Sequence, residues 1–278
     1  MSCDLHIHST YSDGSQNPEE IVAEAIEKKL TAIAIADHDT VKGVRPAVEA
    51  ARGSELLVIP AVEISTEFQK TEVHILGYWI ELDNEQLHAK FAYVREARRR
   101  RANEIVGKLR QHGVEITIED VIAQSDGVSL GRPHVAQALI EAGYVSGMQE
   151  AFDRFLGRDR AAFVRRYKLS PYDAVEAIRN AGGCAVLAHP GLGVSDFVIE
   201  GLIEAGIEGL EAYHTHHSPS NTRRALRIAE EHGLLVTGGT DSHGPRGSHP
   251  VEVGDVDVPD SCAEALVNWV EERDAGVR

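Results

Sequence analysis

The sequence has 278 residues, 42% of them hydrophobic, which fits one large globular domain or one domain carrying an insertion. Its formal net charge of -16 argues against nucleic-acid binding through bulk electrostatics, although a local basic cluster can still hold a phosphate. The three scattered cysteines, Cys3, Cys184 and Cys262, argue against a disulfide framework. The sequence contains no signal-like segment and no apolar run of membrane-spanning length, so we expect a soluble cytoplasmic protein.

The first eighty residues alternate apolar runs, which predict strands, with amphipathic segments, which predict helices. Strands are expected at 5–7, 31–37, 56–65 and 72–80, and helices at 17–30 and near 44–52. This alternation of strand and helix indicates a mostly parallel sheet of an α/β fold.

The middle of the chain is helical and strongly charged, and we interpret residues 85–163 as a helical insertion that covers the substrate. Helices are expected at 88–113, 118–125, 132–142 and 147–156. The strand and helix alternation then returns, so residues 1–84 and 164–278 are expected to form one domain. Its second half is predicted to contain helices at 170–182, 197–206, 220–233 and 260–273, and strands at 184–190, 206–214 and 234–243.

Nearly every predicted strand carries a histidine or a carboxylate at or close to its carboxyl end. Because active sites of barrel-like α/β folds form at the carboxyl ends of the strands, we expect these side chains to cluster. His6 and His8 are two residues apart on one strand and therefore point to the same side. The candidates are His6, His8, Asp13, His38, Glu63, His74, His189, His214, Asp241 and His243.

Each candidate has a structural alternative when it is taken alone. A histidine at a strand end is commonly a hydrogen-bonded structural residue, Asp13 could be a turn residue, and Glu63 could be a solvated strand end. The repetition over many strands favours a metal site instead. Histidine and carboxylate ligands without thiolate suit zinc, manganese or iron, and about nine ligands exceed the need of one ion. With Glu63 able to bridge two ions, the sequence predicts a multi-metal site of the kind that cleaves phosphoesters.

These motifs resemble the PHP family, named for polymerase and histidinol phosphatase. The resemblance is carried by HxH at 6–8, DHD at 37–39, VHILG at 73–77, AHPG at 188–191 and GTDSH at 239–243. The insertion and GRPH at 131–134 further resemble the subfamily of 3',5'-nucleoside bisphosphate phosphatases, some of which are described as 5'-to-3' exoribonucleases. Asp13 stands where many members have histidine, but aspartate is also common in this subfamily.

The resemblance implies a distorted (β/α)7 barrel that binds two to three divalent ions. Mn²⁺ is the expected metal, with Zn²⁺ or Fe²⁺ as alternatives. The implied ligand sets are His6, His8, Glu63 and Asp241 for one ion, Glu63, His74 and His189 for a second, and Asp13, His38 and His243 for a third.

Catalysis is expected to depend on Glu63 and Asp241, because bound ions neutralise phosphate oxygens and lower the pKa of water. His217 and His243 are both candidates to protonate the leaving oxygen, and the sequence does not choose between them. His217 is also a candidate contact of the substrate phosphate, and His214 is the weaker candidate of this segment.

The helix at 88–113 carries five arginines within seven residues, which cannot all share one helix face. They could form an ordinary solvated surface, or some could bind a second phosphate, since guanidinium groups match phosphate oxygens. Arg132 could likewise be an ordinary residue at the start of a helix. The candidate substrate-binding residues are Arg98, Arg99, Arg100, Arg101, Arg132, His134 and His217.

A second phosphate site favours a nucleoside 3',5'-bisphosphate, such as 3'-phosphoadenosine 5'-phosphate converted to AMP, or the 5' end of a short RNA. A small-metabolite phosphatase, such as a histidinol-phosphate phosphatase, is the alternative that should not need the arginines. A non-catalytic, metal-stabilised module is the third alternative. We expect no membrane or double-stranded DNA partner, and the sequence leaves the oligomeric state open.

Overall fold

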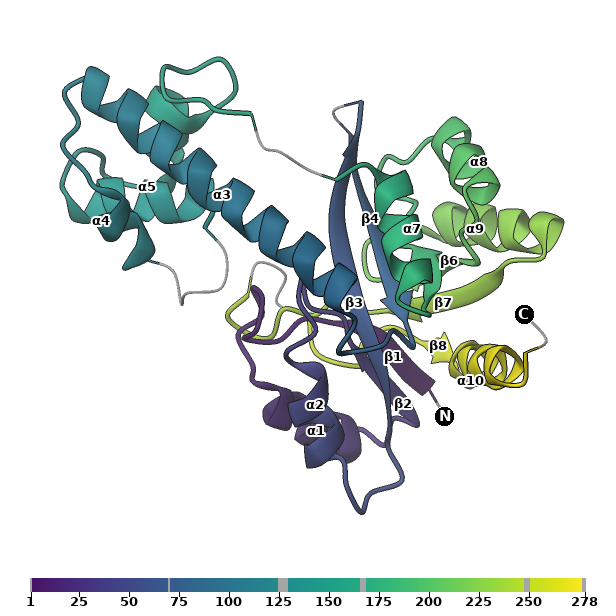
Figure 1. Cartoon of the computed structure of the whole chain (residues 1–278). Helices are drawn as coiled ribbons and strands as arrows, with labels where there is room; N and C mark the ends of the chain where they lie inside the picture. The colour runs from purple at the N-terminus through teal and green to yellow at the C-terminus, as the bar shows by residue number, and fades with distance from the viewer. Residues whose placement is uncertain (1, 70, 125–129, 166–168, 248–250, 277–278) are drawn as a thin grey trace. The chain divides into compact units, whose positions relative to one another are not determined.

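The computed structural model describes residues 2–69, 71–124, 130–165, 169–247 and 251–276. It divides into two compact units, which are described separately (Figure 1). The barrel unit contains Met1–His88 and Leu169–Arg278, and the helical unit contains Ala89–Lys168. Both boundaries fall a few residues later than residues 84 and 164, where the change in sequence character placed them. Within the described residues, no helix combines the length and apolarity needed to cross a membrane.

The barrel unit is built on one sheet with the strand order β7-β6-β5-β4-β3-β2-β1-β8 in the part of the chain that the structure describes. Beyond the sheet edge, the Asp241 N–H donates to the carbonyl of His6, and the His8 N–H donates to the carbonyl of Ser242. These bonds bring β7 beside β1, so the expected α/β fold with a distorted, nearly closed barrel is confirmed. The strands are β1 (Ser2–Ile7), β2 (Ala32–Ile35), β3 (Leu57–Phe68), β4 (Thr71–Tyr78), β5 (Cys184–Leu187), β6 (Gly209–His214), β7 (Leu235–Gly239) and β8 (Val258–Pro259).

Four of the described strand pairings are parallel, as expected, but the sheet is mixed, because β4 is antiparallel to both of its neighbours, β3 and β5. Only residues 69 and 70 separate β3 from β4, and a parallel pair would need a crossover of a dozen or more residues. The strand reversal places His74, in the middle of β4, opposite Ser65, in the last third of β3. His74 therefore reaches the edge of the sheet that carries the candidate ligands, although it is not at the carboxyl end of its strand. We call this edge the ligand edge. The short strand β8, which pairs with β1, was not expected from the sequence.

The helices of the barrel unit begin where their sequences supply caps. Asn17 and Glu20 form a reciprocal capping box at the start of α1, and the Ser170 hydroxyl accepts a hydrogen bond from the Asp173 N–H at the start of α7. Buried side chains such as Ile21 pack α1 onto the sheet. The helices are α1 (Pro18–Glu27), α2 (Val44–Ala50), α7 (Pro171–Asn180), α8 (Asp196–Glu204), α9 (Pro219–His232) and α10 (Asp260–Asp274).

The helical unit has its own apolar core, in which Leu109, Val121 and Leu139 from three helices are fully buried. Its helices match the expected segments, with α6 continuing into a π-helical turn, η1, that the sequence did not indicate. The long helix α3 (Glu85–Gln111) begins in the barrel unit and continues into this unit, and the others are α4 (Ile118–Ile122), α5 (Arg132–Glu141), α6 (Met148–Ala151) and η1 (Phe152–Leu156).

Candidate metal centre

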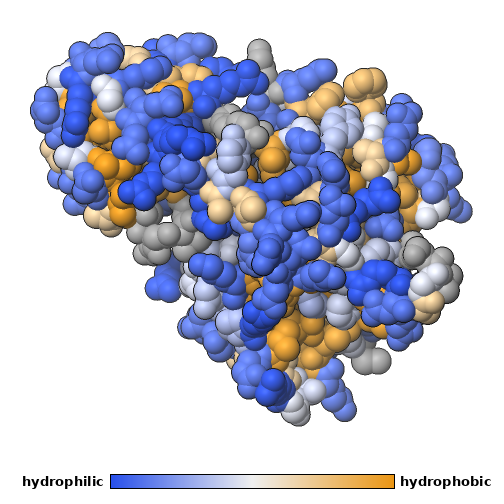
Figure 2. All heavy atoms as spheres, viewed as in Figure 1, coloured by the Kyte–Doolittle hydropathy of each residue, from blue (hydrophilic) through white to orange (hydrophobic). Residues whose placement is uncertain are grey.

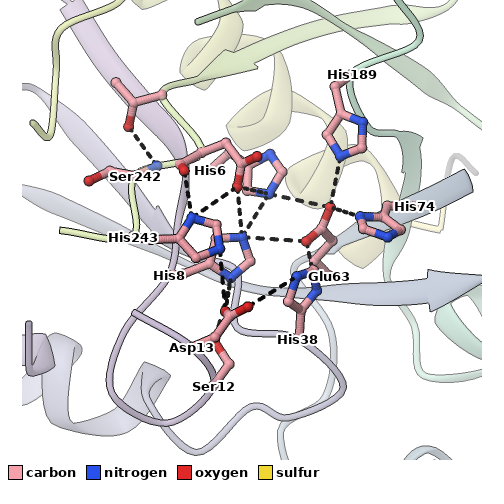
Figure 3. Close-up of polar contacts among 12 residues, drawn as sticks. His6, His8, Ser12, Asp13, His38, Glu63, His74, His189, Ser242 and His243 are labelled. Carbon is pink, nitrogen blue, oxygen red and sulfur yellow. Dashed lines mark hydrogen bonds and ion pairs between the residues drawn. The ribbon is translucent and has the colours of Figure 1, made fainter. Parts of the chain in front are cut away.

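His6 and His8 lie side by side at the carboxyl end of β1, and both rings are buried (Figure 3). The Nε2 atom of His6 lies 3.5 Å from Glu63 Oε1 and 3.6 Å from Asp241 Oδ1. The Nε2 atom of His8 lies 3.4 Å from Glu63 Oε2 and 3.0 Å from Asp241 Oδ1. The structure thus brings together the four side chains expected for the first ion.

Glu63 is at the centre of the cluster, but it lies in the middle of β3 and not at its end. The neighbouring strand β2 is shorter, and a single bridge pairs His38 with Glu63 beyond its end. Glu63 Oε1 is 2.9 Å from His74 Nδ1 and 3.2 Å from His189 Nε2, while Oε2 is 2.9 Å from His38 Nδ1. One carboxylate therefore contacts the rings expected for the second ion and a ring expected for the third.

Asp13 lies on the loop after β1 and faces the remaining ligands of the third set. Its Oδ1 is 3.4 Å from His243 Nε2, and its Oδ2 is 3.9 Å from His38 Nε2. The loop is held by buried Asp37, which accepts hydrogen bonds from the Ser9 N–H at 2.7 Å and the Ser12 hydroxyl at 2.6 Å. These hydrogen bonds hold the loop so that the Asp13 carboxylate faces the histidines. A residue that only formed a turn would not need to face them.

Glu211 on β6 is a buried carboxylate that the sequence motifs did not reveal. Its Oε1 accepts a hydrogen bond from His6 Nδ1 at 3.0 Å, and its Oε2 accepts one from the His189 N–H at 2.7 Å. A proton fixed on Nδ1 leaves Nε2 of His6 as the ligand atom, and carboxylate partners of this kind orient metal-binding histidines. The available signal was the position of Glu211 between Leu210 and Ala212 in an apolar strand, since an unpaired charge is rarely buried there.

Asp4, which the motifs also did not reveal, is fully buried on β1 and connects this strand to the segment that carries Asp241. Its carboxylate accepts hydrogen bonds from the Thr240 N–H at 2.9 Å, the Thr240 hydroxyl at 2.7 Å and the Gly254 N–H at 2.8 Å. Asp241 itself has a φ of 54° and His189 a φ of 30°, a region that residues other than glycine seldom occupy. Such conformations persist only where the surroundings enforce them, as this buried network does for Asp241.

The histidines after β6 are arranged differently from the expectation. His217 donates from Nδ1 to the carbonyl of Ala212 at 2.9 Å and accepts at Nε2 from the Gly191 N–H at 3.0 Å, so the backbone occupies both nitrogens. Burial also lowers the pKa of His217. By contrast, His214 accepts at Nδ1 from the His216 N–H, which places its proton on Nε2, 3.5 Å from Asp241 Oδ2. His214, the weaker candidate from the sequence, therefore faces the cluster.

His243 uses its Nδ1 to donate to the carbonyl of Asp241 at 2.8 Å, which turns its Nε2 towards Asp13. This orientation suits a metal ligand, because the lone pair of Nε2 faces the other ligands. It does not place a proton there, so the geometry gives little support to His243 as the group that protonates a leaving oxygen.

The electrostatics of the cluster fit positive ions. Burial opposes charge on His8, yet hydrogen bonds with Asp241 and Glu63 raise the pKa of His8 to about 10. The pKa of His74 is likewise raised to about 9, against the effect of burial, by the charge of Glu63. Burial alone would raise the carboxyl pKa of Glu63, but the histidine charges hold it well below its usual range. Protons on the rings thus balance charges that divalent ions would otherwise balance.

The donor atoms fall into sets compact enough to hold ions, with all ligand atoms of a set within 4.8 Å of one another. These atoms are imidazole nitrogens and carboxylate oxygens, a combination that suits manganese, zinc or iron. His6, His8 and His38 each belong to two of the sets, as expected where several ions share a cavity. The described residues give the sets His8, Asp13, His38 and His243; His6, His8 and Asp241; His6, Glu211 and His214; and His38, Glu63 and His74.

The helical unit brings three of the expected arginines together. Burial lowers the pKa of Arg101 to about 10, and the nearby charges of Arg132 and Arg98 act in the same direction. Arg101 Nε donates to the carbonyl of Val164 at 2.8 Å, and Arg132 donates to the carbonyl of Leu156 at 3.1 Å. Backbone carbonyls therefore orient these guanidinium groups without neutralising them. We call Arg98, Arg101 and Arg132 the arginine cluster.

The other candidate substrate residues of the helical unit have different surroundings. Arg99 and Arg100 are exposed on α3, and Arg100 lies 5.6 Å from the centre of the Tyr93 ring. His134 accepts a hydrogen bond at Nδ1 from the Gly131 N–H at 3.0 Å, so it caps the start of α5. Arg99 and Arg100 thus differ from the arginine cluster in their surroundings, a difference that the sequence could not reveal.

A barrel with a multi-metal cluster of histidines and carboxylates at its ligand edge defines a metal-dependent phosphoesterase. The family model of the PHP domain matches residues 4–167, and the chain belongs to the PHP family. The 5'-3' exoribonuclease Rnm of Escherichia coli (strain K12) is 32% identical over 249 residues, 87% of this chain and 85% of the relative. A 3',5'-nucleoside bisphosphate phosphatase of Chromobacterium violaceum is 32% identical over 266 residues, 93% of each chain.

Two further comparisons bear on the range of activities and on the fold. A phosphoribosyl 1,2-cyclic phosphate 1,2-diphosphodiesterase of Eggerthella lenta is also 32% identical, over 253 residues, 89% of this chain and 96% of the relative. A crystal structure from Bifidobacterium adolescentis, of a protein assigned by inference as a metal-dependent phosphoesterase, superposes with a TM-score of 0.80. It is 33% identical and covers 96% of this chain and 95% of its own. Overall identity therefore establishes the family but does not select one phosphoester substrate.

Proposed function

We propose that this protein removes the 3'-phosphate of nucleoside 3',5'-bisphosphates, releasing the 5'-monophosphate, and acts on short RNA from its 5' end. The observation that carries the proposal is the arginine cluster, because a metal centre alone would serve any phosphomonoester. Guanidinium groups that are close together and oriented by backbone carbonyls favour a phosphate ligand. Support also comes from two relatives, one named for each of the proposed activities: the exoribonuclease matches 87% of this chain and the bisphosphate phosphatase 93%.

The proposed ligands are those of the three sets implied by the family, and two or three Mn²⁺ ions are the proposed cofactor. When bound, such ions neutralise phosphate oxygens and lower the pKa of water. The chain's own residues hold the site in shape: Glu211 fixes the proton of His6, and Asp4 fixes the segment of Asp241. Among the histidines after β6, His214 is placed to donate a hydrogen bond from Nε2 to a substrate oxygen, whereas both nitrogens of His217 are occupied.

A substrate panel tests the proposal. Mn²⁺-loaded protein should be assayed for product release from a nucleoside 3',5'-bisphosphate, a 5'-monophosphate, a 5'-phosphorylated oligoribonucleotide, a phosphoribosyl 1,2-cyclic phosphate and histidinol phosphate. The highest kcat/KM is expected for the bisphosphate. A clear preference for the cyclic phosphate, which the relative from Eggerthella lenta makes a second candidate, would overturn the proposal. Preference for histidinol phosphate would also overturn it, and no more than one ion per chain with no turnover would indicate a non-catalytic module.

A further inference from the structure

A surface pocket of about 360 Å³ lies in the barrel unit, outside the ligand sets. Its lining consists of Tyr11 from the loop after β1, Val41 and Lys42 from the segment after β2, Arg45 from α2, Leu82 and Asp83 from the segment before α3, and His88 from α3. Its volume is near the lower end for small-molecule sites, and it combines apolar walls with a few polar groups, as such sites do.

The pocket shares two of its loops with the metal centre. Tyr11 precedes Asp13 by two residues, and Lys42 follows His38 by four residues. Both loops are ordered against the cluster, since Asp13 faces His38 across 3.9 Å and the Tyr11 N–H donates to the Ser9 hydroxyl. A substrate phosphate held beside Asp13 and His38 would therefore have this pocket next to it along the same pair of loops.

The lining chemistry fits a nucleotide. Tyr11 is only partly buried and offers an aromatic ring, on which any base can stack. Arg45 already pairs with Asp83 at 2.6 Å, whereas Lys42 is exposed, so we assign the phosphate contact to Lys42. In a chain with a net charge of -16, a wall with two cations and one carboxylate is locally favourable for an anion.

The two proposed substrates differ only beyond the scissile phosphate. In both, water attacks the phosphorus, the bond from phosphorus to the 3'-oxygen of the first nucleotide breaks, and that oxygen takes up a proton. A bisphosphate releases inorganic phosphate, whereas RNA releases a chain shortened by one nucleotide that carries a new 5'-phosphate. RNA alone therefore places a second nucleotide beyond the scissile phosphate.

We infer that the pocket lined by Tyr11 and Lys42 binds the second nucleotide of a single-stranded RNA substrate, with the base on Tyr11 and the following phosphate beside Lys42. The inference rests on the proposed function, because it takes the scissile phosphate to be the one bound at the metal centre. It makes a specific prediction: the pocket contributes to the turnover of RNA and not to that of a bisphosphate with the same first nucleotide.

The test compares adenosine 3',5'-bisphosphate with a short 5'-phosphorylated oligoadenylate, so that only the second and later nucleotides differ. Lys42→Ala should lower the ratio of kcat/KM for the oligonucleotide to that for the bisphosphate about tenfold at low salt, through KM. The slope of log KM against log salt concentration should fall by about 0.7, the value for one phosphate contact of a single strand. Arg227→Ala is the matched control, since Arg227 is an exposed cation on α9 paired with Glu231.

The ring is tested separately. Tyr11→Ala should lower the same ratio about tenfold, and Tyr11→Phe, which keeps the stacking surface, should not. Metal content is measured for each variant, because Tyr11 is close to Asp13 in the chain. The inference is overturned if Lys42→Ala and Tyr11→Ala reduce the two activities equally, or change neither.

Failure of the proposed function gives a different result. If the wild-type protein turns over neither substrate, the proposed function fails, and the pocket is then judged by binding of a fluorescent 5'-phosphorylated oligoadenylate. A Kd raised about tenfold by Lys42→Ala would support the pocket on its own. A Kd unchanged by both substitutions, or no binding by the wild-type protein, would overturn it.

Discussion

In the barrel unit each ligand carboxylate lies within 3.9 Å of at least two imidazoles, whereas in the helical unit the arginine cluster brings charges of one sign together. The centre around Glu63 is internally balanced, because ring protons offset the buried carboxylates. In the arginine cluster, backbone carbonyls orient Arg101 and Arg132, and burial together with the charges of Arg132 and Arg98 lowers the pKa of Arg101. The face shown in Figure 2 is largely hydrophilic, and hydropathy does not distinguish positive from negative charge, so the colouring does not reveal this difference.

The comparison explains how one chain can prepare two kinds of anion contact. Buried opposite charges that share hydrogen bonds hold each other in place without a ligand, which keeps the ligand rings fixed for metal ions. Crowded guanidinium groups raise the free energy of the protein without an anion, and a phosphate would relieve that repulsion. We therefore expect substitutions of the candidate metal ligands to change metal content, and substitutions in the arginine cluster to change substrate preference alone.

The largest effect is expected for Glu63→Ala. Glu63 contacts five histidines of the expected ligand sets, so its loss removes the group that links the sets. Turnover of the bisphosphate should fall about 10³-fold or more, and the metal content per chain should fall with it. Elemental analysis of the purified variant and steady-state kinetics measure both. Glu27→Ala, an exposed residue of α1, is the control, and near-normal turnover by Glu63→Ala would contradict the assignment of the centre.

An intermediate effect is expected for Arg101→Ala in the helical unit. Loss of one guanidinium from the arginine cluster should lower kcat/KM for the bisphosphate about 100-fold while the metal content stays normal. A small phosphomonoester without a second phosphate should be hydrolysed at the wild-type rate. The matched control is Arg100→Ala, because Arg100 is one residue away on α3 but is exposed over Tyr93.

Equal losses for Arg101→Ala and Arg100→Ala would show that general positive charge on α3, and not the arginine cluster, binds the substrate. Equal loss on substrates with one and two phosphates would place Arg101 in structural support of the unit. Either result would remove the contrast between the two units.

The sequence predicted that the candidate ligands would cluster because their spacing follows a simple rule: parallel strands present their carboxyl ends to one edge of a sheet. That rule places His6, His8, His189 and Asp241 without knowledge of packing. It fails for His74, whose strand runs in the opposite direction, and for Glu63, whose strand continues to Phe68. Both residues lie at the ligand edge because of how their strands pair with neighbouring segments: β4 runs antiparallel to β3, and Glu63 pairs with His38 beyond the end of β2.

The sequence could not show which of several similar residues faces the candidate site where this depends on tertiary contacts. His214 and His217 are three residues apart, and only the carbonyl of Ala212 and the N–H of Gly191 show that His217 is occupied. The five arginines between residues 95 and 101 of α3 likewise differ only in what lies opposite each of them. Glu211 was missed because a single acidic residue in an apolar strand has no motif, although its partners make it part of the centre.

The smallest effect, and the finest test of the balanced centre, is expected for Glu211→Gln. Glu211 accepts two hydrogen bonds, from His6 Nδ1 and from the His189 N–H, and it does so with two different oxygens. A glutamine has one carbonyl oxygen, so its NH₂ group must face one of these donors. His6 then loses its orientation or its fixed proton, and metal affinity should fall about tenfold.

Chelator competition on the purified Glu211→Gln variant measures the affinity, with Glu204→Gln, an exposed residue of α8, as the control. A purely structural role for Glu211 would lower the Tm of the metal-free protein and leave the metal affinity of the folded protein unchanged. The positioning role predicts the opposite: a metal Kd about ten times higher, with KM for the bisphosphate unchanged once the metal is saturating. Glu211 bonds the ring of His6 and the backbone N–H of His189, which are proposed ligands of two different ions. Weaker binding of two ions and not of one would therefore show that a single buried carboxylate couples them.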